Sequence, residues 1–316
     1  MRKPLPELDL EKVRLTSLGD RHSKVAMDDF AKPLRPNLSL ASFAQGLPNL
    51  LAAADLKQAA SHIAKAVREG RTVMLCMGGH PIKLGLGPLM VDLMERGVLS
   101  SVSANGSVMV HDSEVALAGA TSEDVSASLG SGSFGVTDET GNLINSAALR
   151  AAATGAGLGR SLGELLLQRG GEGLSASVLA AGARLEIPCT IHAAIGTDVF
   201  NIHPDRDGAD LGKASMDDFH LFCRLVATLE GGVLINLGSA VIMPEVFLKA
   251  LSLTRNLGYT VRRLTTINMD FIRHYRPSVN VVERPVQDGG AGFHFTGHHE
   301  IMFPLLMALV LDELAG

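Results

Sequence analysis

Hydrophobic and polar positions repeat along this chain in the order amphipathic segment, short apolar run, glycine turn. Between Leu56 and Val67 the apolar residues recur every three or four positions, which predicts a helix that ends near Gly70. The apolar run 72–77 comes next and stops at Gly78 and Gly79, which predicts a buried strand followed by a tight turn. The same order predicts further helices over 88–97, 177–186, 216–232 and 244–258, and further strands over 98–106, 188–196, 233–238 and 259–268.

Helices that alternate with apolar strands are typical of βαβ units, whose right-handed crossovers place the strands parallel. We therefore predict an α/β fold over residues 51–316, with a Rossmann-like and mostly parallel sheet flanked by helices. Residues 1–50 are polar and interrupted by Pro33, Pro36 and Pro48. This pattern predicts an extended N-terminal segment that follows the surface or reaches a neighbouring subunit.

The composition argues against several classes of protein. Hydrophobic residues make up 46% of the chain and charged residues 19%, the balance of a globular protein with a sizeable core. A net charge of -5 without a block of lysine or arginine argues against binding to nucleic acid. No signal peptide or membrane-spanning segment is recognisable, and the three distant cysteines suggest reduced thiols. We therefore expect a cytoplasmic protein that does not enter a membrane.

The turns after the strands are where such a sheet binds ligands, because loops lead into helix N-termini there and backbone amides converge. Five predicted segments of this kind carry small or hydrogen-bonding residues, namely 78–87, 104–107, 195–198, 238–240 and 265–268. Together they predict a ligand crevice along one edge of the sheet.

Four stretches of the chain resemble the deoxyhypusine synthase family, in the family's order, over roughly residues 70–316. They are LMVDLMERGVLSSVSANGSVMVHDSEVAL (89–117), IPCTIHAAIGTDVF (187–200), LEGGVLINLGSAVIMP (229–244) and FTGHHEIMFPLLMALVLDEL (295–314). The last is the most specific, because its Phe-Pro-Leu-Leu run at 303–306 stands in the same place relative to the preceding strand.

The resemblance implies a Rossmann-like fold, an NAD site and a homo-oligomer, since the family works as a homotetramer. It also implies which residues line the NAD site, carried over to the matching positions of this sequence. These are Gly78, Gly79, Ala104, Asn105, Gly106, Asp198, Gly238, Ser239, Thr265, Thr266 and Glu300.

The sequence departs from the family at the catalytic centre. Met243 stands in place of the lysine that forms the family's covalent imine, and Pro244 and Glu245 replace two histidines. The chain has no tryptophan for a polyamine pocket, and segment 270–276 is basic where the family is acidic. We therefore expect an NAD-dependent transferase, lyase or oxidoreductase that acts on a small, polar, carboxylate-bearing metabolite, and not hypusine formation.

Four residues are candidates for catalysis. Lys83 follows a glycine turn, where a lysine can bind phosphate, act as a nucleophile or simply face solvent. Asp112 opens a predicted helix, so it is either an acid–base group or a helix cap. His298 and His299 precede the Phe-Pro-Leu-Leu helix and are candidates for proton transfer.

Two other functions stay open at this point. His80, His111 and His298 lie near predicted strand ends, which would suit a metal-dependent hydrolase. Neighbouring histidines point in different directions, however, so the His-His-Glu spacing at 298–300 predicts no metal site. The other alternative is a non-catalytic nucleotide-binding relative that kept the fold after losing the lysine.

Overall fold

The computed structural model describes residues 3–316, and its centre is one sheet of parallel strands. The six strands lie in the order β3-β2-β1-β4-β5-β6. This arrangement confirms the predicted Rossmann-like α/β fold. The strand bounds are β1 Val73–Met77, β2 Ser101–Asn105, β3 Cys189–His192, β4 Val233–Leu237, β5 Thr265–Asp270 and β6 Ala291–Thr296.

Both faces of the sheet are covered, which explains why most of its strands read as unbroken apolar runs. Along β1, Leu75 and Met77 pack into the core on one face, whereas Met74 and Cys76 pack into a second core on the other. β1 and β4 pair in register, so that Met77 lies opposite Leu237 and both strands end at the same level.

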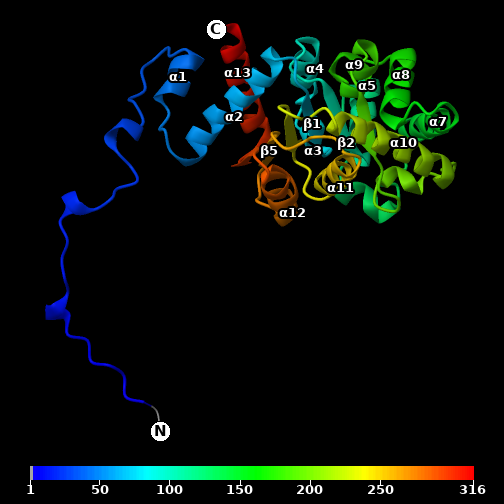
Figure 1. Cartoon of the computed structure of the whole chain (residues 1–316). Helices are drawn as coiled ribbons and strands as arrows, with labels where there is room; N and C mark the ends of the chain where they lie inside the picture. Colours follow the sequence, from blue (N-terminus) through cyan, green and yellow to red (C-terminus); the bar gives the residue numbers. More distant parts are fainter. Residues whose placement is uncertain (1–2) are drawn as a thin grey trace.

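Helices enclose the sheet (Figure 1). Helices α2, α4, α9 and α13 contribute to the core on the Leu75 side, and α11 contributes to the core on the opposite side. The helix bounds are α1 Leu40–Gly46, α2 Leu51–Arg68, α3 His80–Lys83, α4 Gly87–Glu95, α5 Gly106–Ala118, α6 Val125–Ser128, α7 Asp138–Thr154, α8 Leu158–Arg169, α9 Val178–Leu185, α10 Gly208–Val226, α11 Ile242–Asn256, α12 Tyr275–Pro277 and α13 His299–Ala315.

Several element boundaries differ from the prediction; β3, for example, ends at His192 rather than at 196. α10 begins at Gly208 rather than at 216, because the Asp207 side chain accepts hydrogen bonds from the first backbone amides of the helix. β5 begins at Thr265 rather than at 259, because the backbone amides of Arg262 and Arg263 donate to Glu230 and remain outside the sheet. The strand therefore ends later than predicted, at Asp270. α7 and α8 lie where the pattern had predicted no element.

Asp218 links α8 to β3 inside the protein. Its carboxylate is fully buried, and Oδ2 accepts hydrogen bonds from the amides of Gly159 at 3.0 Å and Ile191 at 2.8 Å. Burial raises the pKa of Asp218 to about 7, although the backbone hydrogen bonds act in the opposite direction. Asp218 is thus a structural carboxyl group, far more readily protonated than an exposed aspartate.

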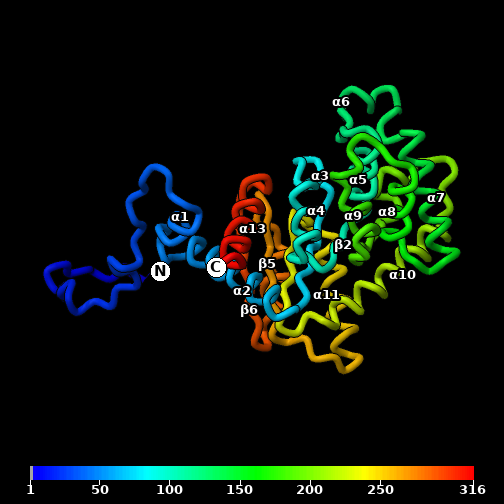
Figure 2. The backbone as a smooth tube through the Cα atoms, turned by 90° about the horizontal axis from the view of Figure 1, so that it is seen from above, coloured from blue at the N-terminus to red at the C-terminus, as the bar shows by residue number. Residues whose placement is uncertain are grey.

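Residues 3–39, called the arm below, run away from the sheet and contain only the short turns η1 (Leu10–Lys12), η2 (Leu18–Asp20) and η3 (Met27–Asp29). Helix α1 follows and packs beside α13 (Figure 1). Figure 2 shows the arm leaving on the α13 side, opposite to α6 and α7. Apolar side chains of the arm face solvent, with Leu5 exposed at 92% and Leu15 at 91%.

Within residues 3–316, no helix combines the length and the apolar character that crossing a bilayer requires.

Candidate functional site

The chain leaves the adjacent strands β1 and β4 toward opposite faces of the sheet. α4 follows β1 and packs into the core with Leu75, whereas α11 follows β4 and packs into the other core. Open α/β sheets bind ligands in the crevice at such a reversal, outside the carboxyl ends of the strands. The two turns at this point are Gly78–Gly79 and Gly238–Ser239, and all four residues are among the sequence-predicted NAD contacts.

Glycine is required in these turns because the backbones approach each other closely. A Cβ atom added at Gly78 would lie 2.5 Å from the carbonyl oxygen of Gly238. Gly238 itself has a φ of +63°, and a Cβ there would lie 2.8 Å from Cε1 of His299. No larger side chain fits at either position unless its neighbours move, so glycine lets the two turns pack against each other and against His299.

The end of β2 adjoins the same turns. A Cβ atom added at Gly79 would lie 2.6 Å from Oγ of Ser107, in the first turn of α5. The Ser107 hydroxyl in turn donates to Oδ1 of Asn105 at 2.7 Å. Ala104 is buried inside β2, so it can meet a ligand only through its backbone. The structure therefore places Gly79, Asn105 and Gly106 at one edge, beside the N-terminus of α5.

Asp198 reaches this edge from the loop after β3. Its Oδ2 accepts a hydrogen bond from the amide of Ala194 at 2.6 Å. A Cβ added at Gly106 would overlap the same carboxylate, at 2.1 Å from Oδ2. Burial raises the pKa of Asp198, opposed by the hydrogen bond from Ala194. A carboxylate pressed against the first residue of α5 is well placed to accept hydrogen bonds from ligand hydroxyls.

His299 is the most unusual polar group at this edge. Its side chain is 1% exposed, and neither ring nitrogen has a hydrogen-bond partner among residues 3–316. Nε2 lies 3.6 Å from Oδ1 of Asp270, at the end of β5. The ring also meets His80 and Phe271 edge-on, with centroids 5.4 and 5.6 Å away. Buried polar groups are normally satisfied, so the imidazole beside the Gly238 turn is the strongest candidate for a functional group at this edge.

Electrostatics around His299 keep Asp270 ionised and His80 neutral. Burial alone would raise the pKa of Asp270, but the interactions with His299 and the Phe271 amide outweigh it and lower that pKa below its usual value. The pKa of His80 is lowered by burial first, and then by the charges of His299 and Lys83. The cluster therefore combines a carboxylate, a buried imidazole and an exposed imidazole whose proton is held weakly.

The adjacent histidines have different surroundings. The side chain of His298 is 72% exposed, and its Nδ1 lies 3.9 Å from Glu300, whose side chain is 43% exposed. Of the pair, only His299 faces the interior. The structure thus separates the two histidines predicted for proton transfer, and it places Glu300 at the solvent-facing start of α13.

The other two catalytic candidates occupy very different places. Lys83 is exposed on α3, close enough for its charge to act on His80. Asp112 is fully buried, and its carboxylate accepts hydrogen bonds from Ser177 Oγ at 2.6 Å and from the amides of Val178 and Leu179. Asp112 lies inside α5, which begins at Gly106, so the prediction that it opens and caps its own helix was wrong. Its carboxylate instead binds the N-terminus of α9 and is closed off from the strand ends.

The prediction for Thr265 and Thr266 needs a correction. Both are the first residues of β5, so they lie at the amino-terminal edge of the sheet, opposite to the crevice. Thr265 Oγ1 is hydrogen-bonded to Nδ1 of His62 at 2.7 Å instead. The error follows from the misplaced strand, whose carboxyl end was expected at Asn268. The residues that leave β5 at the crevice are Asp270 and Phe271.

Two members of the cluster were missed as catalytic candidates. Asp270 was considered only as part of a basic segment, and His80 only as a metal ligand. The signal for Asp270 was present, because it is a carboxylate at the end of an apolar strand. Recognising it required the correct end of β5, which the run of apolar and polar residues did not show.

The histidines of the metal hypothesis do not form a ligand set. His111 hydrogen-bonds to Thr121 Oγ1 at 2.9 Å and lies 3.6 Å from Glu114, whereas His298 faces solvent. Within residues 3–316, no three histidine, cysteine or carboxylate side chains come together as a metal site would require. The geometry therefore provides no support for a metal-dependent hydrolase.

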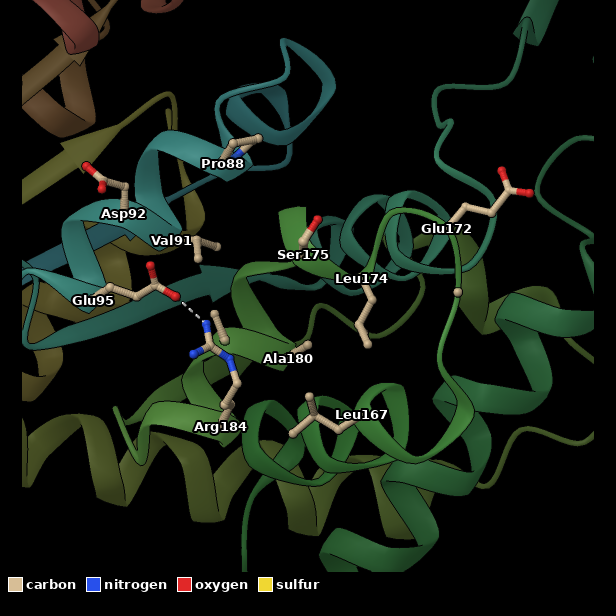
Figure 3. Close-up of a pocket in the computed structure, with 12 residues that line it drawn as sticks. Pro88, Val91, Asp92, Glu95, Leu167, Glu172, Leu174, Ser175, Ala180 and Arg184 are labelled. Carbon is tan, nitrogen blue, oxygen red and sulfur yellow. Dashed lines mark hydrogen bonds and ion pairs between the residues drawn. The ribbon is translucent and has the colours of Figure 1, made fainter.

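A cavity of about 680 Å³ lies away from this edge, between α4, α8 and α9 (Figure 3). Apolar side chains such as Val91, Leu174 and Ala180 line it. At one end Arg184 donates to Glu95 at 2.6 Å, so these two charges satisfy each other. The cavity contains none of the glycine turns or histidines of the strand ends, so it is separate from the candidate site.

Comparisons with solved structures agree with this fold. A putative deoxyhypusine synthase from Entamoeba histolytica has a TM-score of 0.52 at 12% identity, over 89% of this chain and 96% of that one. A conserved putative LOR/SDH protein from Methanococcus maripaludis S2 has a TM-score of 0.51 at 18% identity, over 82% and 70%. The resemblance to deoxyhypusine synthases is thus confirmed at the level of the fold.

A third similar structure is AgrE in a ternary complex with ornithine and NAD+, with a TM-score of 0.50 at 14% identity. The match covers 82% of this chain but only 33% of AgrE, so this chain corresponds to about one third of that protein. No protein-family model and no curated protein sequence matches this chain.

Proposed function

We propose that this protein is a cytoplasmic NAD-binding enzyme that acts on a small polar metabolite and does not form deoxyhypusine. The observation that carries the proposal is His299, a buried imidazole with two unpaired nitrogens between the Gly238 turn and the Asp270 carboxylate. A group of this kind at the strand reversal of a Rossmann-like sheet suits proton transfer next to a bound nucleotide.

The strand ends fit a dinucleotide. The turns at Gly78 and Gly238 pack closely together because neither residue has a Cβ, and α5 begins beside them at Gly106. Asn105 and Asp198 would accept hydrogen bonds from ribose hydroxyls, because both carry side-chain oxygens at this edge. When bound, NAD would supply the capacity to accept a hydride from the substrate. That AgrE, of similar fold, has been seen with NAD+ supports this choice.

The protein's own contribution is to hold and move the proton. Asp270 lies nearest to Nε2 of His299 and would stabilise a proton on that atom, which leaves Nδ1 to accept a second proton. His80 is exposed and its ring adjoins that of His299, so it would exchange the proton with solvent. The lowered pKa of His80 favours release of the proton near neutral pH.

Two differences from the deoxyhypusine synthase family bear on the substrate, namely Met243 in place of the lysine and the basic segment 270–276 in place of an acidic one. Met243 is 1% exposed and packs into the core beneath α11, so this position provides no amine for an imine. Arg276 lies 3.3 Å from Glu245, whereas Arg273 is exposed without a carboxylate partner among residues 3–316. An unpaired arginine just beyond Asp270 favours a substrate that carries a carboxylate.

Calorimetric titration with NAD, followed by a turnover screen, tests the proposal. We expect saturable binding at about one site per chain, and formation of NADH with at least one small hydroxy or amino acid. His299→Gln should lower that turnover about 100-fold or more, the usual contribution of a general acid or base. His298→Gln is the matched control and should stay near the wild-type rate, because its side chain faces solvent.

Each outcome has a distinct meaning. A folded protein that does not bind NAD would refute the proposal outright. Binding without turnover, unaffected by any metabolite, would favour the non-catalytic nucleotide-binding relative. Equal loss of activity in both histidine variants would contradict the assignment of proton transfer to His299.

We also propose that the chain forms a homo-oligomer through the arm. Its apolar side chains face solvent, with Leu8 exposed at 79% and Met27 at 82% in addition to Leu5 and Leu15. Apolar surface of this kind is stabilised when it is buried against another molecule, and a second copy is the partner that is always present.

Sedimentation velocity tests the proposed assembly. The full-length protein should sediment as a dimer or tetramer, and a variant that lacks residues 1–38 should shift to smaller species. A variant with Leu8, Leu15 and Met27 replaced by serine keeps the length of the arm but should also dissociate. An unchanged oligomer in both variants would show that the arm does not hold the assembly together.

A further inference from the structure

A row of polar side chains crosses the sheet just below the crevice. Strands of a sheet that is covered on both faces usually carry apolar side chains. Two asparagines nevertheless lie inside this sheet, Asn236 at 1% exposure and Asn268 fully buried. Buried amides need partners, so this row calls for an explanation. In register across the strands the row consists of Thr190, Ser103, Cys76, Asn236, Asn268 and His294.

The hydrogen bonds between β4, β5 and β6 run in one direction. Nδ2 of Asn236 donates to the carbonyl of Ser239 at 2.9 Å and to Oδ1 of Asn268 at 2.7 Å. Because both partners are acceptors, the orientation of the Asn236 amide is determined. Asn268 must then present its own Nδ2 to Nδ1 of His294, which lies 3.4 Å away. His294 therefore accepts at Nδ1 and, when neutral, carries its proton on Nε2.

The chain of hydrogen bonds begins at the turn that the site depends on. Gly238 is in the left-handed region with a φ of +63°, and Ser239 follows it directly. The Ser239 hydroxyl accepts a hydrogen bond from the amide of Met243 at 3.2 Å, which ties the turn to α11. Asn236 ties the same residue to the sheet. The shape of the Gly238–Ser239 turn thus depends on a side chain buried below it.

We propose that Asn236 and Asn268 are positioning residues that hold the Gly238–Ser239 turn in its ligand-binding shape, and that the protonation state of His294 controls how firmly they hold it. The inference rests on the proposed function, in which this turn contacts NAD. A protonated imidazole carries hydrogens on both nitrogens, so the Asn268 amide would lose its acceptor. Rotating the Asn268 amide by 180° would not help, because its Nδ2 would then face Nδ2 of Asn236 and two donors would meet.

The surroundings of His294 keep it neutral under ordinary conditions. Burial lowers its pKa first, the charge of Arg273 lowers it further, and Asp270 acts in the opposite direction. The packed π-helical segment η7 (Ser278–Glu283) contributes one ionisable side chain, Glu283. The row is therefore intact at neutral pH, and its hold on the turn should weaken as acidification protonates His294.

Calorimetric titration with NAD between pH 8 and pH 5 tests the inference. Asn268→Leu should weaken NAD binding about 10-fold at pH 8, the usual effect of leaving a buried partner unsatisfied. Asn280→Leu is the matched control, because Asn280 is also buried on this side of the sheet but bonds to Glu245 and Arg284 instead. Comparable weakening in both variants would mean a general loss of packing and would overturn the inference.

The pH dependence of NAD binding by His294→Gln distinguishes control by protonation from a purely structural role of His294. Glutamine can accept from Asn268 but does not titrate, so this variant should bind NAD like the wild type at pH 8. It should also lose the part of the pH dependence that follows the His294 titration. Retention of the full wild-type pH profile would overturn the inference.

A measurement without NAD separates this inference from the proposed function. In the NAD-free protein, the NMR amide shifts of Gly238 and Ser239 should move with the titration of His294, and this component should vanish in His294→Gln. If NAD does not bind but the shifts behave in this way, the proposed function fails while the coupling stands. If the shifts ignore His294, the coupling fails even in a protein that binds NAD.

Discussion

Replacing Gly238 by alanine should weaken NAD binding at least about 100-fold, equivalent to about 3 kcal/mol of binding free energy, in a protein that still folds. The added Cβ would lie 2.8 Å from Cε1 and 3.1 Å from Nε2 of His299. Alanine is also strained at a φ of +63°. Both effects displace the turn and the imidazole together, and calorimetric titration with NAD would measure the result.

Gly258→Ala is the matched control for backbone strain. Gly258 has a φ of +89°, but nothing lies within 4 Å of a Cβ added there. This variant should lose only the stability that backbone strain costs and still bind NAD with wild-type affinity. Wild-type binding by Gly238→Ala would show that the ligand does not depend on this turn.

Acidification from pH 7 to pH 3 should lower the free energy of unfolding by about 4 kcal/mol through the titration of His192. His192 is buried at the end of β3, its Nε2 lies 3.1 Å from Thr190 Oγ1, and its ring packs edge-on against Phe222. Burial lowers its pKa from 6.5 to about 3. Between pH 6.5 and about pH 3, His192 is therefore protonated in the unfolded chain but neutral in the folded protein. The stability linked to His192 is fully present above pH 6.5 and is lost as the pH falls.

Urea unfolding of the wild type and of His192→Phe at several pH values would isolate this effect. Phenylalanine keeps an aromatic ring against Phe222 but does not titrate, so the variant should lose less stability on acidification. The difference between the two proteins is the relevant quantity, because other groups titrate as well. Asp218, with its pKa raised to about 7, gains stability over part of the same range. Parallel pH profiles for the two proteins would contradict the burial of a neutral His192.

The glycine turns could be predicted because their requirements are local. Gly78 and Gly238 directly follow the runs of β1 and β4, and Gly106 follows β2 after Asn105; a strand that ends in glycine indicates a tight turn in any parallel sheet. Once the strands are parallel, their carboxyl ends meet at one edge whatever the loops contain. The pattern of the chain alone was therefore enough to place this part of the candidate site.

The proton-transfer cluster could not be predicted in the same way. His299 and Asp270 come from separate strand ends, and their distance of 3.6 Å depends on how β5, β6 and α13 pack. The bounds of β5 were misplaced because residues 259–268 form an apparently continuous strand pattern that includes Arg262 and Arg263, which lie outside the strand. The Glu230 carboxylate accepts hydrogen bonds from the backbone amides of both arginines, and it is too far away in the sequence for a local pattern to show this.

By itself, the sequence determined the alternation of helices and strands, the parallel sheet and the glycine turns, because hydrophobic periodicity and glycine conformation act over a few neighbouring residues. Only the tertiary structure decided which of two adjacent histidines turns inward, and that Asp112 caps α9 from another element. It also decided that the Asn236 side chain donates a hydrogen bond to the Gly238–Ser239 turn. These outcomes depend on burial and on partners distant in the chain, which no local pattern records.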